Sequence, residues 1–303
     1  MYDLIIVGGG PAAYSAGVYA SRYNMNCLIL SKQRGGLVLT THLLENWPGE
    51  KSIKGFDLVN KFQDHVTSLG VEIKDLTVNE ITKENEIFTI KTDSETFQAK
   101  TVILATGSTH REHPAEGIKA FHGRGVSYCA TCDGMFFKDK IVAMIGSGDS
   151  AIKEAVTLSE ISKKVYVISR SDKITAEPLN VSRLKSKEEK GKVEILYNLN
   201  VVEIVGDKKV EKIIFDKEHN GSTELMVDGV FVAIGQIPQS GLAKNLGVEL
   251  NRMGEIIVSK HGETNIPGFY SAGDVTDFGF KQVITASSQG AAAVYSAFNY
   301  IQK

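Results

Sequence analysis

The chain has 303 residues, of which 42% are hydrophobic and 23% charged, so it is long enough to form two globular domains with ordinary cores. Its 34 Lys and Arg residues nearly balance 36 Asp and Glu residues without a long block of one sign, which argues against nucleic acid or an anionic membrane as a partner. The N-terminus lacks the features of a signal peptide, and no apolar stretch reaches the roughly 18 residues of a membrane span. With only three cysteines, we expect a soluble, cytoplasmic protein.

The N-terminal segment predicts a dinucleotide-binding unit. An apolar run, residues 4–7, precedes Gly8-Gly-Gly-Pro-Ala-Ala13, and an Ala-rich helical stretch then leads to a second apolar run, residues 27–30. In this β-α-β pattern Gly8 makes the tight turn, Gly10 lets backbone N–H groups approach a pyrophosphate, and Ala13 keeps the helix close to the strand. The acidic residue that usually follows the second strand is missing, because Ser31-Lys32-Gln33 stands there, so we expect ribose recognition to differ from the common pattern.

Loops, a helix and short strands follow. Residues 34–36 and 45–49 are rich in Gly and Pro, which is typical either of backbone lying against a flat ligand or of ordinary turns. Residues 55–69 predict an amphipathic helix with Phe56, Val59, Phe62 and Val66 on one face. Short β-rich pieces from 71 to 100 lead to a buried run, 102–107, that ends in glycine. The polar segment 108–117 is a plausible domain boundary.

Two of the three cysteines, Cys129 and Cys132, stand two residues apart and are followed at once by Asp133. A thiolate attacks a disulfide and a second nearby thiol resolves the mixed disulfide, so this spacing suits a reversible two-electron switch. Asp133 is placed to manage the proton of a departing thiolate. A structural disulfide and half of a zinc site are the alternatives, but zinc needs about four ligands and Cys27 lies in an apolar run. We therefore predict a redox-active pair.

The N-terminal pattern then repeats. A buried run, residues 140–145, precedes Gly146-Ser-Gly-Asp-Ser-Ala151, a helical stretch follows, and after a β-rich section the run 230–235 again ends in glycine. The halves Gly8–Gly107 and Gly146–Gly235 thus share one order of elements. This internal duplication predicts an α/β fold with two Rossmann-like domains.

The C-terminal piece has no third dinucleotide fingerprint, the glycine-rich Gly-x-Gly-x-x-Ala pattern found at residues 8–13 and 146–151. It contains Gly273-Asp274 and then Lys281-Gln-Val283, which leads into an Ala-rich helix, residues 285–300. A carboxylate at this place suits ligand hydroxyls, and the amides of a helix N-terminus suit a phosphate or ring oxygen. A solvated helix cap is the alternative explanation for Asp274.

Over nearly its whole length the chain resembles the low-molecular-weight thioredoxin reductases. The resemblance rests on both fingerprints, Glu45-Asn-Trp-Pro-Gly49, Ala105-Thr-Gly107, Gly125-Val-Ser-Tyr-Cys-Ala-Thr-Cys-Asp133 and Ala272-Gly-Asp274. The resemblance implies a flavoprotein oxidoreductase, a class II pyridine nucleotide-disulfide oxidoreductase that works as a homodimer. It implies a three-layer β/β/α architecture with the second Rossmann-like domain inserted in the first, so that residues 1–113 and 240–303 bind FAD and residues 114–239 bind a pyridine nucleotide.

The resemblance also implies a route for the electrons, from the nicotinamide through FAD and the Cys129–Cys132 disulfide to thioredoxin or a thioredoxin-like protein. Cys132 would lie against the flavin, Cys129 would attack the partner, and Asp133 would be the acid. The middle domain would rotate on hinges near 112–118 and 236–243.

The implied FAD-binding residues are Gly8, Gly10, Pro11, Ala12, Ala13, Ser31, Gly35, Gly36, Leu37, Asn46, Ala105, Thr106, Gly107, Gly273, Asp274, Lys281, Gln282 and Val283. The implied nicotinamide dinucleotide residues are Gly146, Gly148, Asp149, Ser150 and Arg170.

Several positions depart from the family pattern. The usual Gly-Gly-Gln is Gly-Gly-Leu37 here, which replaces a polar flavin contact by an apolar one. The usual His-Arg-Arg and later Arg that clamp the 2′-phosphate of NADPH are Ser169-Arg170-Ser171 and Thr175, with Asp172 nearby. The carboxylate that favours NADH is also absent. We therefore predict weak or absent NADPH preference, with NADH, reduced ferredoxin or another flavin donor as the replacement.

The residues are also compatible with other acceptors and with another class of function. The acceptor is thioredoxin or, alternatively, a peroxiredoxin-type or small-molecule disulfide, and Met135-Phe-Phe137 forms either a docking patch or buried core. A redox-sensing regulatory protein is the third possibility, although its expected loss of the cysteines is not seen. No metal is expected, since metal-ligand spacing is absent among the seven histidines, His42, His65, His110, His113, His122, His219 and His261. We interpret Cys27 as a small core residue.

Overall fold

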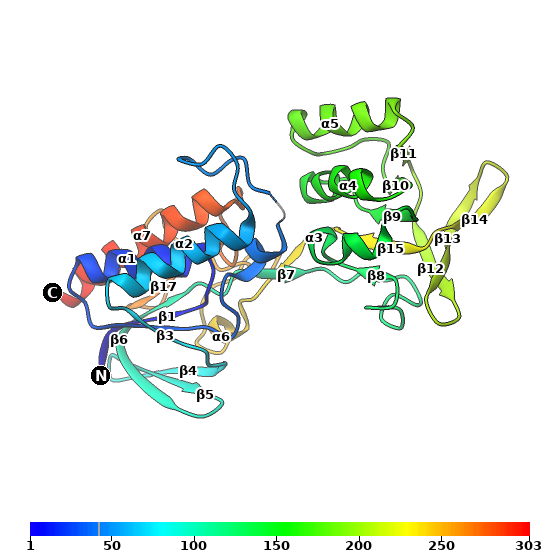
Figure 1. Cartoon of the computed structure of the whole chain (residues 1–303). Coiled ribbons are helices and arrows are strands. Elements are labelled where there is room, and N and C mark those ends of the chain that lie inside the picture. Colours follow the sequence, from blue (N-terminus) through cyan, green and yellow to red (C-terminus); the bar gives the residue numbers. More distant parts are fainter. Residues whose placement is uncertain (42) are drawn as a thin grey trace. The chain divides into compact units, whose positions relative to one another are not determined.

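The computed structural model describes residues 1–41 and 43–303, so His42 lies outside the described residues. The chain forms two compact units: residues 1–109 with 237–303, and residues 110–236 (Figure 1). These boundaries lie a few residues before the domain limits expected from the sequence. None of the described helices is long and apolar enough to cross a membrane.

The first unit is built on one sheet with a parallel core. Its strands have the order β3-β2-β1-β6-β5-β4, and β17 pairs with the C-terminal part of β6. Their bounds are β1 (Tyr2–Val7), β2 (Cys27–Leu30), β3 (Glu72–Lys74), β4 (Val78–Glu84), β5 (Ile87–Thr92), β6 (Thr96–Leu104) and β17 (Phe269–Ser271). The C-terminal piece of the chain therefore completes the sheet begun by the N-terminal piece.

Both faces of this sheet are buried, as the uninterrupted apolar run of β1 predicts. Leu4 and Ile6 face one core cluster, while Ile5 and Val7 face another. The first cluster lies under the helices α1 (Pro11–Arg22), α2 (Gly55–Ser68) and α7 (Val283–Ile301), and α1 packs against both α2 and α7. Two short helices, η1 (Gly36–Thr40) and α6 (Gly241–Lys244), complete the unit.

One expected core position in α2 is wrong. Phe56 is 61% exposed, whereas Leu58 and Val59 are buried. Phe56 is the second residue of the helix and helical side chains tilt toward the N-terminus, so Phe56 stands at the end of the stripe that Val59 and Val66 form and has no preceding turn of α2 beside it.

The second unit repeats this plan. Its parallel sheet has the order β11-β10-β9-β15-β8, and a separate antiparallel sheet has the order β12-β13-β14. The strand bounds are β8 (Val126–Ser127), β9 (Ile141–Ile145), β10 (Lys164–Ile168), β11 (Val193–Leu196), β12 (Val201–Gly206), β13 (Val210–His219), β14 (Ser222–Met226) and β15 (Gly229–Val232). The helices are α3 (Ala130–Asp133), η2 (Gly134–Phe137), α4 (Asp149–Ile161) and α5 (Pro178–Glu189).

The two faces of the β9 strand again serve two cores. Val142 and Met144 lie in the cluster with α4 and α5, whereas Ala143 and Ile145 lie in the cluster with β12 and β13. A helical layer, a parallel sheet and an antiparallel sheet therefore form three layers in this unit. The predicted fold class, two Rossmann-like domains with the second inserted in the first, is confirmed by this architecture and by the structural comparisons reported below.

Two short strands connect the units. β7 (Ser108–His110) and β16 (Gln236–Pro238) pair with each other, so the chain leaves and re-enters the first unit at neighbouring points. Within the first unit, Gln239 N–H donates to the Gly107 carbonyl at 2.9 Å and the Thr106 hydroxyl donates to the Gln239 carbonyl at 2.7 Å. Both hydrogen bonds hold Gln239, which follows β16, beside Thr106 and Gly107, which precede β7.

Candidate redox site and nucleotide cradles

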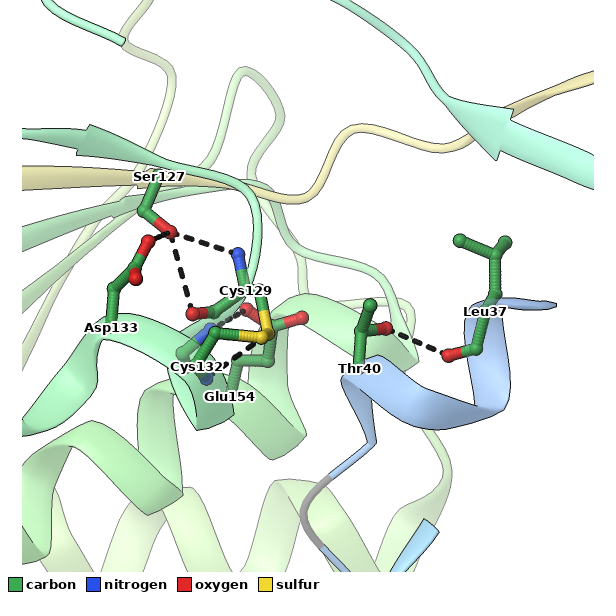
Figure 2. The surroundings of a disulfide bond; sticks show 8 residues. Leu37, Thr40, Ser127, Cys129, Cys132, Asp133 and Glu154 are labelled. Atoms are coloured by element: carbon green, nitrogen blue, oxygen red, sulfur yellow. Dashed lines mark hydrogen bonds between the residues drawn. A yellow bond between two sulfur atoms is a disulfide. The ribbon is translucent and has the colours of Figure 1, made fainter. Parts of the chain in front are cut away.

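The dithiol segment follows an edge strand of the second unit. β8 ends at Ser127, and Cys129 takes extended backbone as the N-cap of the short helix α3. The sulfurs of Cys129 and Cys132 form a disulfide, with 5.4 Å between the two Cα atoms (Figure 2). The Cys-x-x-Cys spacing thus places both sulfurs on one turn of helix.

The backbone of this turn distinguishes the two sulfurs. The Cys132 N–H donates to Cys129 Sγ at 3.1 Å, the bond that an N-cap side chain receives from the third helical residue. A donor aimed at sulfur lowers the free energy of a thiolate there once the disulfide is reduced. Cys129 is therefore the better-placed nucleophile.

Asp133 belongs to a hydrogen-bonded chain that includes the dithiol turn. The Ser127 hydroxyl donates to Asp133 Oδ2 at 2.6 Å and accepts from the Cys129 N–H at 3.0 Å (Figure 2). Ser127 is buried and Asp133 is half-buried, so this chain runs from the interior of the unit to its surface. The arrangement ties the acid expected from the sequence to the cysteine through one hydroxyl, which sequence spacing does not reveal.

A second acid at this site, Glu154, is missed by the sequence analysis. It lies on α4, and its Oε2 accepts a hydrogen bond from the Ala130 N–H at 3.2 Å, one residue after Cys129 (Figure 2). Burial raises the pKa of this carboxyl to about 7, although the hydrogen bond from the Ala130 N–H acts to lower it. A signal existed in the sequence, because position 154 falls three residues after Ala151 and four before Leu158, on the buried face of the helix.

The first glycine loop is shaped by close backbone contacts. Gly8 has φ +136°, and a Cβ there would lie 2.1 Å from the Ala105 carbonyl oxygen. A Cβ on Gly10 would meet no atom within 4 Å, and Gly10 precedes Pro11, the first residue of α1. Open space over backbone N–H groups at the start of this long helix is what a pyrophosphate needs. The residues that the sequence assigns to FAD all lie in this unit.

Several of these residues meet around the same loop. A Cβ on Gly36 would lie 3.7 Å from the Gly10 Cα, and one on Gly273 would lie 3.1 Å from the Ala12 Cβ. The C-terminal Gly273-Asp274 turn and the loop before η1 therefore lie beside the N-terminal fingerprint. Both ends of the chain contribute to one cradle.

Two polar groups of the cradle have no hydrogen-bond partner among the residues that the structure describes. Ser31 Oγ, at the end of β2, is buried with no hydrogen-bond partner among the described residues. The Asp274 carboxylate is largely enclosed, and burial raises its pKa against the field of Lys281. A buried hydroxyl and a desolvated carboxylate without partners suit the hydroxyls of a ribose or ribityl chain. The cradle therefore fits FAD.

Other assigned residues are used by the protein itself. Lys281 Nζ pairs with Glu255 at 3.0 Å and donates to the Thr276 carbonyl. The Gln282 side chain caps α7, and its Oε1 accepts from Asn46 Nδ2 at 3.0 Å. Lys281, Gln282 and Asn46 therefore shape the wall of the cradle through contacts within the protein.

The second glycine loop repeats the first in detail. Gly146 has φ +138°, and a Cβ there would lie 2.2 Å from the Ala233 carbonyl oxygen, while Gly148 faces open space. Ser150 is exposed in the first turn of α4. Asp149 accepts from the Glu177 N–H, from Asn180 and from Lys153. Burial would raise its pKa, but these contacts lower it on balance.

The loop after β10 offers little positive charge to a ligand. The hydroxyl of Ser169 is buried and lies 3.3 Å from that of Ser171, which itself donates to the Lys173 carbonyl. Thr175 N–H donates to the Ser147 carbonyl at 2.9 Å, which brings this loop against the second fingerprint. Arg170 is exposed and makes no ion pair with any residue in the described part of the chain.

The apolar residues after the dithiol divide between surface and core. Met135 and Phe136 are 66% and 74% exposed, whereas Phe137 is buried against Phe231 with ring centroids 5.2 Å apart. Of the two alternatives for this tripeptide, buried core holds for Phe137, while Met135 and Phe136 are placed as a docking patch would require. Two apolar side chains remain on the surface within four residues of Cys132.

Comparisons with known proteins agree with this geometry. The family model described as pyridine nucleotide-disulphide oxidoreductase matches residues 2–290. A thioredoxin reductase from Listeria innocua is 36% identical over 306 aligned residues, covering 100% of this chain and 95% of the relative. Crystal structures of thioredoxin reductases from Lactococcus lactis and T. acidophilum align with TM-scores of 0.95 and 0.94, at 34% and 37% identity. Each alignment covers 100% of this chain and 99% of the other. The chain therefore belongs to the pyridine nucleotide-disulphide oxidoreductase family, among the thioredoxin reductases.

Proposed function

We propose that this enzyme passes two electrons from a reduced donor through FAD and the Cys129–Cys132 pair to the disulfide of thioredoxin or a thioredoxin-like protein. The observation that carries the proposal is the disulfide itself, seated on a helical turn with a backbone donor on Cys129 Sγ and an acid linked through Ser127. Residues 1–113 with 240–303 are proposed to bind FAD and residues 114–239 the nicotinamide dinucleotide.

FAD supplies the two-electron relay between donor and disulfide when it is bound. The residues proposed to hold it are those of the first glycine loop with Ser31 and Asp274, on the strength of the open space at Gly10 and the two polar groups without partners. Leu37 replaces a polar contact of the family pattern. The protein's own part is to bind and orient the cofactor and to exclude water from it.

The proposed exchange with the partner conserves electrons and protons. Two electrons and one proton, supplied by the reduced donor and solvent, break the Cys129–Cys132 bond and leave a Cys129 thiolate and a Cys132 thiol. The Cys129 thiolate attacks one sulfur of the partner disulfide, and Asp133 gives a proton to the sulfur that leaves. Cys132 then gives its proton back to Asp133 and attacks the Cys129 sulfur, which restores the disulfide and releases the second sulfur of the partner as a thiolate that takes up a proton from solvent.

A thioredoxin-like acceptor is supported by the surface beside the dithiol. Met135 and Phe136 offer an apolar contact that a folded protein can cover and a small-molecule disulfide cannot. Reduction of thioredoxin, followed by an insulin or dithionitrobenzoate readout, tests the acceptor. Turnover with thioredoxin that disappears in C129S and C132S supports the proposal. Turnover confined to a peroxiredoxin or a small disulfide overturns it.

We further propose that the preference for NADPH is weak or absent and that NADH, reduced ferredoxin or another flavin donor replaces it. The loop after β10 presents one exposed arginine where the family pattern has a clamp of several cations, and Asp172 stands nearby. Turnover should be compared with NADPH, NADH and reduced ferredoxin. The double variant S171R/T175R should lower the KM for NADPH about tenfold or more, because a 2′-phosphate gains two charged donors, while R170A serves as the matched control. A low-micromolar KM for NADPH in the wild type would contradict this proposal.

A further inference from the structure

The dithiol turn is held from behind by helix α4. A Cβ placed on Gly134 would lie 3.4 Å from side-chain atoms of Leu158 and Ile161, so the turn packs closely on this helix. Among these apolar neighbours lies one acid, Glu154, whose Oε2 accepts from the Ala130 N–H at 3.2 Å. Ala130 is fully buried and directly follows Cys129. The carboxyl therefore sits against the first backbone donor of the helix that carries the nucleophile.

Charged groups on the surrounding elements are engaged elsewhere. On α3, Asp133 is bonded to Ser127, and η2 carries no charged residue. On α4, Lys153 pairs with Asp149, and Glu160 pairs with Lys187 of α5. Lys164 of β10 pairs with Glu194 of β11. The remaining cations on these elements or at their ends include Lys138, Lys140, Lys163, Arg183 and Lys185, and none forms an ion pair with Glu154 in the described chain.

We propose that Glu154 is a positioning residue of the dithiol, which holds the Ala130 N–H and controls how readily the Cys129 thiol ionises. The proposal rests on the proposed function for the choice of Cys129 as the attacking sulfur. The Glu154 carboxylate on α4 is hydrogen-bonded to the residue that follows Cys129, so its negative charge opposes that of a Cys129 thiolate: an ionised Glu154 disfavours the thiolate and a neutral Glu154 does not. When the Cys129 thiol ionises its proton goes to solvent, and Glu154 becomes easier to protonate.

This coupling has a functional use. Burial brings the pKa of Glu154 to about 7, so its charge changes within the range in which such enzymes work. Below that pH Glu154 is mostly neutral and does not oppose ionisation of the Cys129 thiol. Above it the Glu154 carboxylate is charged and opposes that ionisation. Glu154 thereby limits how nucleophilic Cys129 becomes in alkaline solution.

The test measures ionisation of Cys129 alone in the full-length protein. In a C132S background the remaining cysteine, Cys27, is buried in the core and its pKa is raised, so it serves as an internal control. The rate of alkylation of Cys129 by iodoacetamide, followed by mass spectrometry from pH 5 to 10, gives the pKa of its thiol. E154Q keeps an oxygen for the Ala130 N–H and removes the charge. E160Q makes the same chemical change on the exposed side of the same helix.

Adding E154Q should lower the alkylation midpoint by about half a unit to one unit, with a threefold to tenfold faster reaction near pH 7. Adding E160Q should leave the midpoint where it is. E154M, a neutral side chain of similar length, should shift it in the same direction and replaces E154Q if that variant does not fold. The proposal is overturned if the neutral variant has the same alkylation midpoint as the C132S parent. The assay needs neither FAD nor thioredoxin, so its failure is separable from failure of the proposed function.

Discussion

At the scale of single residues, two acids serve the dithiol turn in different surroundings. Asp133 accepts from the Ser127 hydroxyl, which itself accepts from the Cys129 N–H, whereas Glu154 has the Ala130 N–H as its one hydrogen-bond partner among the described residues. Asp133 directly follows Cys132 and is half-buried, so it can exchange a proton with a partner sulfur or with solvent, whereas the Glu154 carboxyl is largely buried. The geometry therefore favours Asp133 for proton transfer and leaves Glu154 an electrostatic part.

The variant D133N should slow the reaction with the partner. Removing a positioned acid typically costs about 10²-fold or more in rate, so we expect a loss of that size in the reoxidation of pre-reduced enzyme by thioredoxin disulfide. Reduction of the enzyme by its donor should change much less. D139N, at an exposed position six residues on, is the matched control. Equal rates for D133N and D139N would exclude Asp133 as the acid.

Glu154 should make stability depend on pH. Its pKa is about 7 in the folded chain and near 4.3 when unfolded, so the folded state holds the proton more tightly. The contribution to the free energy of unfolding is fully present below about pH 4 and is lost as pH rises through 7. Relative to wild type, E154Q should gain on the order of 2 kcal/mol between pH 5 and pH 8 in urea unfolding. The control E160Q should not, and pH curves of wild type and E154Q that run parallel would refute the assignment.

At the scale of secondary structure, the 3-10 helix η2 presents both an anchor and a contact surface. Phe137 packs on Phe231 and blocks any side chain at Gly229, where a Cβ would lie 2.1 Å from its ring. This anchored end holds Phe136 and Met135 outward beside the disulfide. An exposed aromatic side chain on a rigid turn loses little entropy when a partner covers it.

F136A should therefore weaken the encounter with thioredoxin selectively. We expect its KM for thioredoxin to rise about tenfold, as the loss of one aromatic anchor of 1–2 kcal/mol implies, while kcat changes little. M226A removes an equally exposed apolar side chain from β14 of the same unit and should have no effect. A similar KM for both variants would place the docking surface elsewhere. Turnover with dithionitrobenzoate, which needs no docking surface, provides the activity control.

Sequence patterns were most informative where the backbone itself imposes the residue. Both glycine loops were predictable, because a side chain at Gly8 or Gly146 would collide with a carbonyl of the neighbouring strand. For Glu154 the helical spacing predicts a place on the buried face of α4, but its bond to the Ala130 N–H joins two segments that are distant in the sequence and has no local pattern. The division of Met135 to Phe137 between surface and core also depends on a contact, that of Phe137 with Phe231, between residues far apart in the sequence. Distant pairings of this kind leave no local signal.

At the scale of the whole molecule, each unit has cores of its own. Of the four hydrophobic clusters among the described residues, two consist only of residues from the first unit and two only of residues from the second. The N-terminal and C-terminal pieces of the first unit are joined by the pairing of β6 with β17 and the packing of α1 on α7. Stability of the first unit therefore does not require the second, but each of its pieces requires the other.

This organisation predicts that the second unit can be removed without loss of the first. A chain in which residues 110–236 are replaced by a short Gly-Ser linker should fold, because Gln239 and Gly107 are already held together by a hydrogen bond at the excision point. It should purify with bound FAD and show no reduction of thioredoxin. Residues 1–109 alone should bind none, because they lack Asp274 and α7. Flavin absorbance and thermal unfolding of the three proteins decide the matter: an excised chain that folds without flavin would show that the cradle is incomplete, and one that does not fold would show that the units depend on each other.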